Sequence, residues 1–336
     1  MNSMERIGAV LSGGVPDRRP FTLTLSLYGA RLAGVSAVDY FADPALYAAG
    51  QKAVVDLCEP DIVFGPFALA LEAEAYGALV ERFSDAPPLV KNPAFKSALD
   101  IESITRPEPE SDPRLRFLVD SVRAVVQDQH GTRPVAAPIT APCDLPVLLL
   151  GMDQWLETLL FKPELAAQWG RLATEHFEAL ATAYFTAGAS FLVSPVMLAN
   201  PAIIHPELAD RTILPILKDA FGRSPGPIVF HHGGNRLSRS LDQVKDLPNI
   251  AGFVVDERDA LAVSRRTLGA APLLLGNLSG PHFAHRHPAD IANRTVQILR
   301  DREADVNFIL ASSNADIPYD TDPDCVVAVR RAVEAF

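Results

Sequence analysis

Short apolar runs alternate with longer amphipathic stretches along most of the chain. Eight of the apolar runs have the length and content of buried strands, and they fall at residues 21–27, 61–65, 134–140, 190–193, 227–231, 250–255, 272–276 and 307–311. Near-continuous apolar strands separated by helical stretches predict a parallel sheet that is covered by helices. Eight such strands predict an α/β fold of the (β/α)8 TIM barrel type.

Proline and aspartate mark several helix starts. Asp43-Pro44 places Asp at the cap and Pro at the first position of a helix that runs to about residue 58. Further helices are expected at about 114–130, 142–150, 153–161, 163–187, 206–221, 238–246, 258–268, 288–302 and 323–335. The pattern weakens over 72–113, where a hairpin and a proline-rich run are expected, and then resumes. We interpret this segment as an insertion after the second strand of a single domain spanning residues 1–336.

Four consecutive predicted strands end in polar residues. The apolar run at 227–230 leads into His231-His232-Gly233-Gly234-Asn235, and the next three strands lead into Asp256-Glu257, Asn277 and Ser312-Ser313-Asn314. A single His at a strand end is more often a structural residue than a ligand or catalyst. The carboxyl ends of barrel strands share one face, however, so four polar ends predict one pocket. Its candidate residues are His231, His232, Asn235, Asp256, Asn277 and Asn314.

Three other polar residues follow the first two predicted strands. Arg31 follows the first strand and would reach the same face, where a guanidinium can bind a substrate carboxylate bidentately. A surface salt bridge is the alternative for this side chain. Glu72 and Glu74 follow the second strand, and a solvated helical face explains them better than a pair of catalytic carboxylates.

Composition narrows the classes of function. The 336 residues are 48% hydrophobic and 21% charged, as in a soluble globular protein with a sizeable core. A net charge of −11 without a dense basic cluster argues against nucleic acid as a partner. No signal peptide is visible, and no apolar run approaches the ~20 residues of a membrane span. Three widely separated cysteines without CxxC spacing suit a reducing compartment, so we expect a cytoplasmic protein that does not bind membranes.

Taken together, these stretches resemble the uroporphyrinogen decarboxylase superfamily, and within it the branch of methylcobamide:thiol and other corrinoid methyltransferases. The landmarks lie along nearly the whole chain; they are residues 30–34, 72–77, 107–115, 140–142, 149–151, 231–235, 256–257, 275–278, 308–310 and 317–318. The resemblance implies a β/α barrel with its site at the carboxyl ends of the strands. It also implies a small-molecule substrate and a separate corrinoid protein as partner.

In that methyltransferase branch a zinc ion binds the acceptor thiol and keeps it as the nucleophilic thiolate. The zinc site looks like His-x-Cys at the fifth strand, an acidic residue after the sixth and a cysteine after the eighth. His231 matches the histidine, and Asp256 or Glu257 matches the acid. Gly233 and Ala315 stand at the two cysteine positions, so the resemblance leaves thiol activation in doubt.

A site without thiolates would have to use nitrogen and oxygen ligands. The residues available for zinc or another divalent metal are His231, His232, Asp256 and Asp316. Without a metal, the resemblance implies transfer of a methyl group from an O-methyl or similar donor to a corrinoid protein. His231 would then assist the leaving oxygen as acid or base, with Asp256 orienting its ring.

The leading hypothesis is a methyltransferase-like enzyme in which Asn277 and Asn314 hydrogen-bond the substrate. Porphyrinogen decarboxylation is the alternative within the superfamily, and it implies basic residues near the first strand and an Asp after the second. Arg18 and Arg19 supply basic residues, but Asp61 lies at the start of the second strand instead of its end. A third hypothesis is that the missing cysteines mark lost catalysis and leave a ligand-binding or corrinoid-docking protein.

Overall fold

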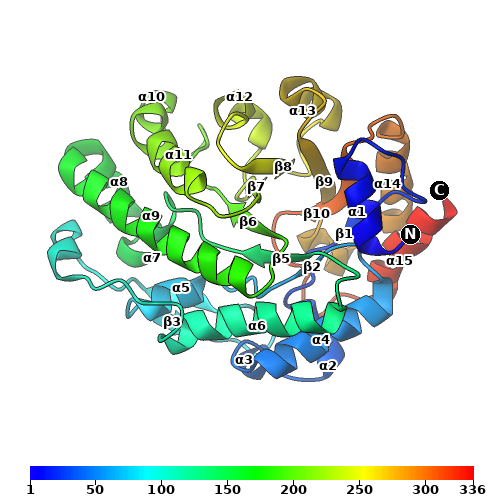
Figure 1. Ribbon diagram of the computed structural model, residues 1–336, viewed down its shortest axis with the longest axis horizontal. Coiled ribbons are helices and arrows are strands. Elements are labelled where there is room, and N and C mark those ends of the chain that lie inside the picture. Colours follow the sequence, from blue (N-terminus) through cyan, green and yellow to red (C-terminus); the bar gives the residue numbers. More distant parts are fainter.

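A computed structural model describes residues 1–336. Eight parallel strands form one sheet in the order β1-β10-β9-β8-β7-β6-β5-β2 (Figure 1). They are β1 (Phe21–Thr22), β2 (Val63–Phe64), β5 (Val135–Pro138), β6 (Phe191–Pro195), β7 (Ile228–His231), β8 (Ile250–Val254), β9 (Leu273–Ser279) and β10 (Phe308–Ser313). Each strand lies at a predicted position.

Hydrogen bonds between the segments of the two outermost strands, β1 and β2, close the sheet into a barrel. The Asp61 amide donates to the carbonyl of Phe21 over 2.8 Å, and the Thr22 hydroxyl donates to the carbonyl of Ile62 over 2.9 Å. The predicted (β/α)8 TIM barrel is confirmed. The first strand ends earlier than the expected residue 27, because the Thr24 amide donates to the Ser312 side chain instead of a backbone carbonyl.

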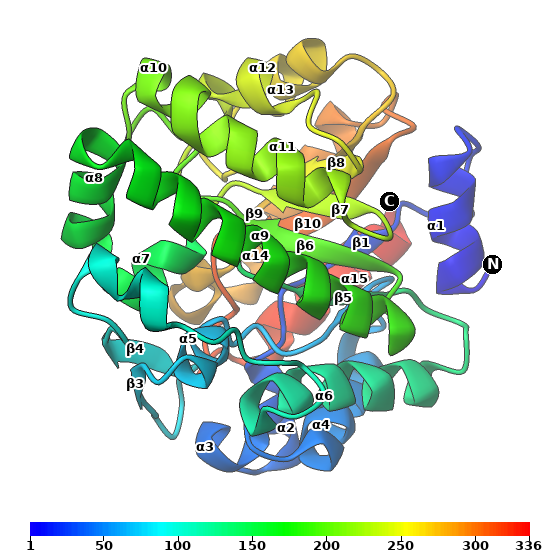
Figure 2. The ribbon, with the colours of Figure 1, turned by 60° about the vertical axis from the view of Figure 1, so that its left-hand side comes forward.

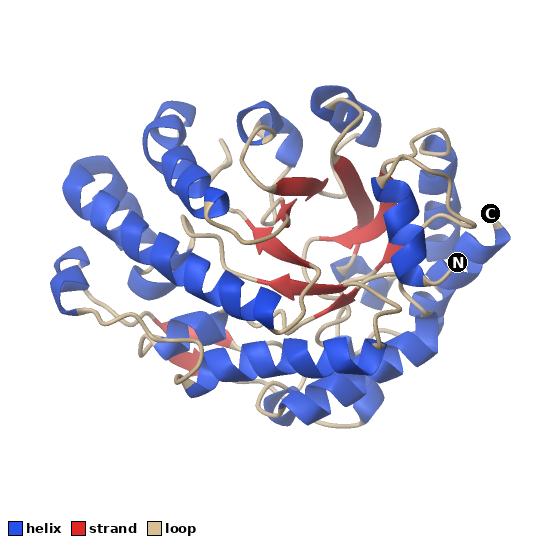
Figure 3. Cartoon of the chain, viewed as in Figure 1, coloured by secondary structure: helices blue, strands red, loops and turns tan.

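Helices surround the strands on the outside of the barrel (Figure 3). They are α1 (Ser3–Leu11), α2 (Tyr28–Ala33), α3 (Ala37–Tyr40), α4 (Pro44–Cys58), α5 (Ala70–Ala75), α6 (Pro113–Gln129), α7 (Leu145–Leu150), α8 (Met152–Phe161), α9 (Pro163–Thr186), α10 (Pro206–Leu208), α11 (Leu214–Gly222), α12 (Leu241–Val244), α13 (Leu261–Leu268), α14 (Pro288–Asp301) and α15 (Pro323–Ala335). Short helical turns η1 to η4 cover Ala98–Ser103, Ala209–Ile213, Leu237–Arg239 and Pro281–His285. None of the helices has the length and apolar character needed to cross a membrane.

The insertion after β2 contains the expected hairpin. Strands β3 (Leu79–Glu81) and β4 (Leu89–Asn92) pair antiparallel and form a separate two-stranded sheet. Both strands contact α5, beside which they lie in Figure 2. The insertion therefore lies outside the barrel wall and leaves the order of the eight strands intact.

Helix α1 closes the end of the barrel at which the strands begin. Ile7 and Val10 are buried in one cluster with the apolar side chains of the barrel interior. Arg6 donates to the buried carboxylate of Asp61 over 2.5 Å, and Arg18 donates to the same carboxylate over 2.7 Å. In Figure 3, α1 lies at the end opposite to the arrowheads of β5 and β6. The open end of the barrel is therefore the end at which the strands finish.

Candidate functional site

A cavity of about 390 Å³ lies at the carboxyl ends of the strands. We call it the central pocket; the lining residues used below are Phe67, Thr140, Asp144, Met197, His231 and Asn314. They come from segments that follow β2, β5, β6, β7 and β10. Of the four polar strand ends expected to share one pocket, those of β7 and β10 line this cavity through His231 and Asn314, whereas Asp256 and Asn277 do not line it.

The two adjacent histidines of the β7 end point in different directions because side chains alternate along a strand. Val229 packs in the barrel interior, whereas Ile228 and Phe230 pack in the outer core between strands and helices. His231 continues the inward-facing series and lines both the central pocket and a small cavity inside the barrel. His232, the next residue, is completely buried behind the pocket.

The His231 ring lines the central pocket and is held by its own loop. Its Nδ1 accepts the backbone N–H of Gly233 over 3.2 Å. Burial, together with the neighbouring His232, lowers the pKa of His231 well below its usual value, and a hydrogen bond to the backbone of Asn314 offsets only part of this effect. A neutral ring that accepts at Nδ1 carries its proton on Nε2, so His231 has an N–H donor at the pocket wall.

His232 contacts residues that follow three different strands, β7, β8 and β10. Its Nε2 accepts the backbone N–H of Asn314 over 3.1 Å, and its Nδ1 lies 3.0 Å from the carbonyl oxygen of Asn235. The same Nδ1 lies 3.5 Å from a carboxylate oxygen of Asp256. Its side chain has no exposed surface, so His232, predicted to contact substrate, instead fixes the loops that shape the pocket.

Asp256 lies against His232 and Arg258 and has no contact with His231. The Arg258 side chain donates to both carboxylate oxygens, over 2.5 and 2.8 Å, and the Arg258 amide adds a third bond of 2.8 Å. Burial raises the pKa of Asp256, but the hydrogen bonds from Arg258 outweigh it and hold the pKa below its usual value. Asp256 therefore orients His232, whereas the sequence predicted that it orients His231.

Two other candidates hold backbone segments in place. The Asn277 amide nitrogen donates to the carbonyl oxygens of Asp256 and Asp259 over 3.0 and 2.9 Å. Arg31 donates from one guanidinium nitrogen to the carbonyl oxygens of Tyr319 and Thr321 over 2.9 and 2.6 Å. The Asn277 amide and this Arg31 nitrogen therefore already donate to backbone carbonyls. The Asn314 side chain, in contrast, lines the central pocket without a partner.

The sequence profile described as "Uroporphyrinogen decarboxylase (URO-D)" matches residues 2–336. The chain belongs to the uroporphyrinogen decarboxylase family. This confirms the family expected from the sequence landmarks. No curated protein sequence matches the chain.

Solved structures with the same fold include several methyl-transfer proteins. A "methyltransferase from Methanosarcina mazei" is 20% identical, with a TM-score of 0.87 over 100% of this chain and 99% of that chain. A B12-independent methionine synthase from Shewanella sp. W3-18-1 is 10% identical, with a TM-score of 0.55 over 89% of each chain. A putative vitamin-B12 independent methionine synthase from Listeria monocytogenes is 15% identical, with a TM-score of 0.52 over 95% of each chain. These likenesses establish the fold.

The side chains that were predicted as metal ligands do not lie together in this protein. No group of three or more His, Cys, Asp or Glu side chains is placed to hold a metal ion. The Asp316 carboxylate, one of the predicted ligands, accepts the backbone N–H of Leu27 over 3.3 Å. Gly233 has φ +61°, and a Cβ built there would lie 2.6 Å from the backbone carbonyl of Val196. Position 233 therefore has no room for a thiolate, and the residues present do not fit the expected zinc site.

Two residues of the pocket wall were not among the candidates. The buried Asp144 carboxylate accepts the backbone N–H groups of Met197 and Leu198 over 2.6 and 3.1 Å. Burial raises its pKa to about 6. Thr140 is the last residue of the third predicted strand and Asp144 lies four residues beyond it, and this position was the available signal for both.

Glu72 is buried, which corrects the prediction of a solvated helical face. Its carboxylate accepts the backbone N–H and the hydroxyl of Thr140, both over 2.8 Å, and lies 3.0 Å from His176 Nε2. The helix that carries it is covered by other segments, which the local sequence pattern did not reveal. Glu72 therefore supports the wall of the central pocket from behind.

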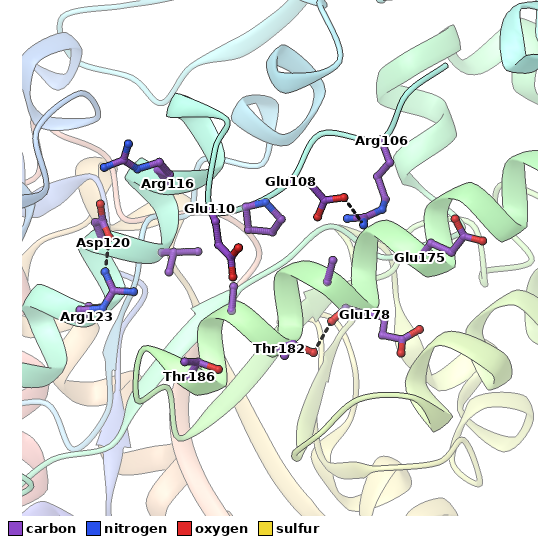
Figure 4. A pocket seen from close by; sticks show the side chains of 14 residues that line it. Arg106, Glu108, Glu110, Arg116, Asp120, Arg123, Glu175, Glu178, Thr182 and Thr186 are labelled. Carbon is purple, nitrogen blue, oxygen red and sulfur yellow. Dashed lines mark hydrogen bonds and ion pairs between the residues drawn. The ribbon is translucent and has the colours of Figure 1, made fainter. Parts of the chain in front are cut away.

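Two further cavities lie outside the central pocket. One, which we call the outer pocket, has a volume of about 470 Å³ and is lined by residues that include Glu257, Arg258, Asn277, Ser279, Arg286 and Arg294. The other is a groove of about 690 Å³ between α6 and α9 on the outside of the barrel (Figure 4). In that groove Arg106 pairs with Glu108 over 2.6 Å, and Arg123 pairs with Asp120. Its size alone does not make it a site.

Proposed function

We propose that this protein is an enzyme that transfers a methyl group between a small molecule and a corrinoid protein. Family membership and the likeness over the whole chain to a methanogen methyltransferase support the reaction class. The observation that carries the proposal is the neutral His231, whose ring accepts at Nδ1, carries its proton on Nε2 and lines a pocket at the open end of the barrel.

His231 has the properties of a hydrogen-bond donor to a leaving group. When a methyl group leaves an oxygen, the C–O bond breaks and its electron pair stays on the oxygen. The reduced cobalt of the corrinoid would accept the methyl group. A fixed N–H donor in a site with little water stabilises the negative charge that develops on the leaving oxygen. Because its pKa is depressed, His231 acts as a donor without giving up its proton, which suits an O-methyl donor with a stabilised oxyanion product.

The geometry gives less support to activation of a thiol. Thiolate formation in the related methyltransferases depends on a zinc site, and neither Gly233 nor the residues around His231 supply one. The proposal therefore places the chain at the demethylation of a small methyl donor, with the corrinoid protein as methyl acceptor.

Porphyrinogen decarboxylation is disfavoured by the positions of the basic residues. Arg18 bonds the buried Asp61 at the closed end of the barrel. Arg19 donates to backbone carbonyls of residues 302–308, and Arg31 donates to those of residues 319 and 321. None of these three arginines lines the central pocket, so the carboxylates of a tetrapyrrole would have no basic partners there.

The test is a methylation assay with added cob(I)alamin. Purified protein is incubated with panels of O-methyl, N-methyl and S-methyl compounds, and methylcobalamin is followed by its absorbance. We expect at least one O-methyl compound to support methylation. Turnover of uroporphyrinogen without methyl transfer would replace the proposal with decarboxylation. Binding of methyl compounds without turnover of either kind would make the chain a ligand-binding member of the family.

A further inference from the structure

The outer pocket lies at the carboxyl ends of β8 and β9 and shares no lining residue with the central pocket. Arg258 lies in the segment after β8, Arg286 lies in the segment after β9, and Arg294 belongs to α14. Three arginines therefore line this one cavity in a chain whose net charge is −11.

Two of these arginines have no counter-charge. Arg258 is bound to Asp256, but no carboxylate forms an ion pair with Arg286 or Arg294. Arg294 makes only neutral contacts, to the side-chain oxygens of Gln297 over 3.0 Å and Asn277 over 3.5 Å. Like charges repel where they are brought together, so the two guanidiniums favour a negative ligand.

Two acidic residues also line the outer pocket, and neither is paired with Arg286 or Arg294. Glu257 lies 3.4 Å from the Nδ1 of His282. Asp290 also lines the pocket and forms no ion pair. Its carboxylate therefore opposes an anion, and the ligand must reach the two free guanidiniums without contacting it.

Ser279 also lines the outer pocket, but its hydroxyl has no exposed surface. The groups that a ligand in this cavity can reach are therefore the exposed side chains of Arg286 and Arg294.

We infer that the outer pocket binds an oxyanionic group of a small molecule, a carboxylate or a phosphate, through Arg286 and Arg294. Guanidinium groups bind both kinds of oxyanion through two parallel N–H donors. This inference does not rest on the proposed methyl transfer, because the two cavities are lined by different residues.

The outer pocket is also connected to the central pocket through hydrogen bonds. Arg294 contacts Asn277, which holds the backbone of Asp256. The Asp256 carboxylate faces His232, and His232 fixes the Asn314 loop beside the central pocket.

The experiment is isothermal titration calorimetry of the full chain with inorganic phosphate and, separately, with malonate. Sodium chloride keeps the ionic strength constant, since it screens unspecific attraction. We expect saturable binding of at least one probe, and the tighter one identifies the group. Arg286→Gln and Arg294→Gln should each weaken binding about 10-fold or more. Arg300→Gln, an exposed arginine of the same helix α14 that does not line the pocket, should bind as the parent does.

Two results would overturn the inference. One is the absence of saturable binding of both probes to the parent chain. The other is equal weakening by Arg300→Gln, which would mean attraction to overall charge. Circular dichroism checks that each variant is folded, and Arg286→Lys and Arg294→Lys replace any glutamine variant that is not. The lysine variants keep the charge but lose the paired donors, so they should bind more weakly than the parent.

Discussion

The central pocket and the outer pocket lie at the same end of one barrel and differ in how their polar groups are satisfied. In the central pocket, Asp144 and His232 use their polar atoms to hold backbone segments, and the side chains of His231 and Asn314 line the cavity. In the outer pocket, Arg286 and Arg294 lack ionic partners. The central pocket therefore suits a neutral reacting group, and the outer pocket suits a charged group that holds the ligand in place.

The largest predicted effect concerns the floor of the central pocket. Gly233→Ala should lower the free energy of unfolding by about 3 kcal/mol, because a Cβ there meets the Val196 backbone and the φ of +61° strains any side chain. Gly234→Ala is the matched control, since its φ is also positive at +88° but its Cβ would meet nothing within 4 Å. It should cost about 1 kcal/mol. Urea unfolding measures both, and equal losses would contradict the close approach at Gly233.

The next effect separates paired from unpaired arginines. Arg258→Gln should lower the free energy of unfolding by about 2–3 kcal/mol, because the completely buried Asp256 carboxylate loses two charged donors. Arg286→Gln removes an exposed arginine without an ionic partner and should change stability by less than about 0.5 kcal/mol. Chemical denaturation of the two variants tests this difference. A larger loss for Arg286→Gln would mean that its charge is already compensated.

A smaller effect concerns the pH dependence of stability near the central pocket. Burial raises the pKa of Asp316 to about 7, so the folded chain holds this proton more tightly than the unfolded chain does. The stabilisation that comes from this proton is fully present below about pH 4 and is lost as pH rises through 7. Asp316→Asn should therefore lose less stability than the parent between pH 5 and pH 8, as measured by urea midpoints.

Asp17→Asn serves as the control of opposite sign. The hydrogen bond from Arg6 holds the pKa of Asp17 well below its usual value, so its contribution is present above about pH 4. This variant should lose stability equally at pH 5 and pH 8. A parallel pH dependence of the parent and Asp316→Asn would show that Asp316 does not carry the predicted proton.

The barrel could be predicted because its signals are local. Apolar runs of strand length, Asp-Pro helix starts and polar strand ends are each contained within a few residues, and all eight strands lie where these signals place them. The family landmarks extended the same information over the whole chain.

The roles of individual residues depend on partners far away in the sequence. His231 and His232 are equivalent in a list of polar residues, yet strand alternation sends one into the pocket and the other toward Asp256 and Asn314. Attention to alternation from Val229 onward would have separated them. The burial of Glu72 depends on Thr140 and His176, and no local pattern shows these contacts.

The most direct test of the account compares His231 variants in the cob(I)alamin methylation assay. His231→Ala removes the N–H donor and should slow methyl transfer about 100-fold. His231→Gln offers an amide N–H in its place and should recover part of the rate, while His205→Ala, an exposed histidine outside both pockets, should match the parent. An unchanged rate in His231→Ala would contradict the central claim that the His231 donor stabilises the leaving group.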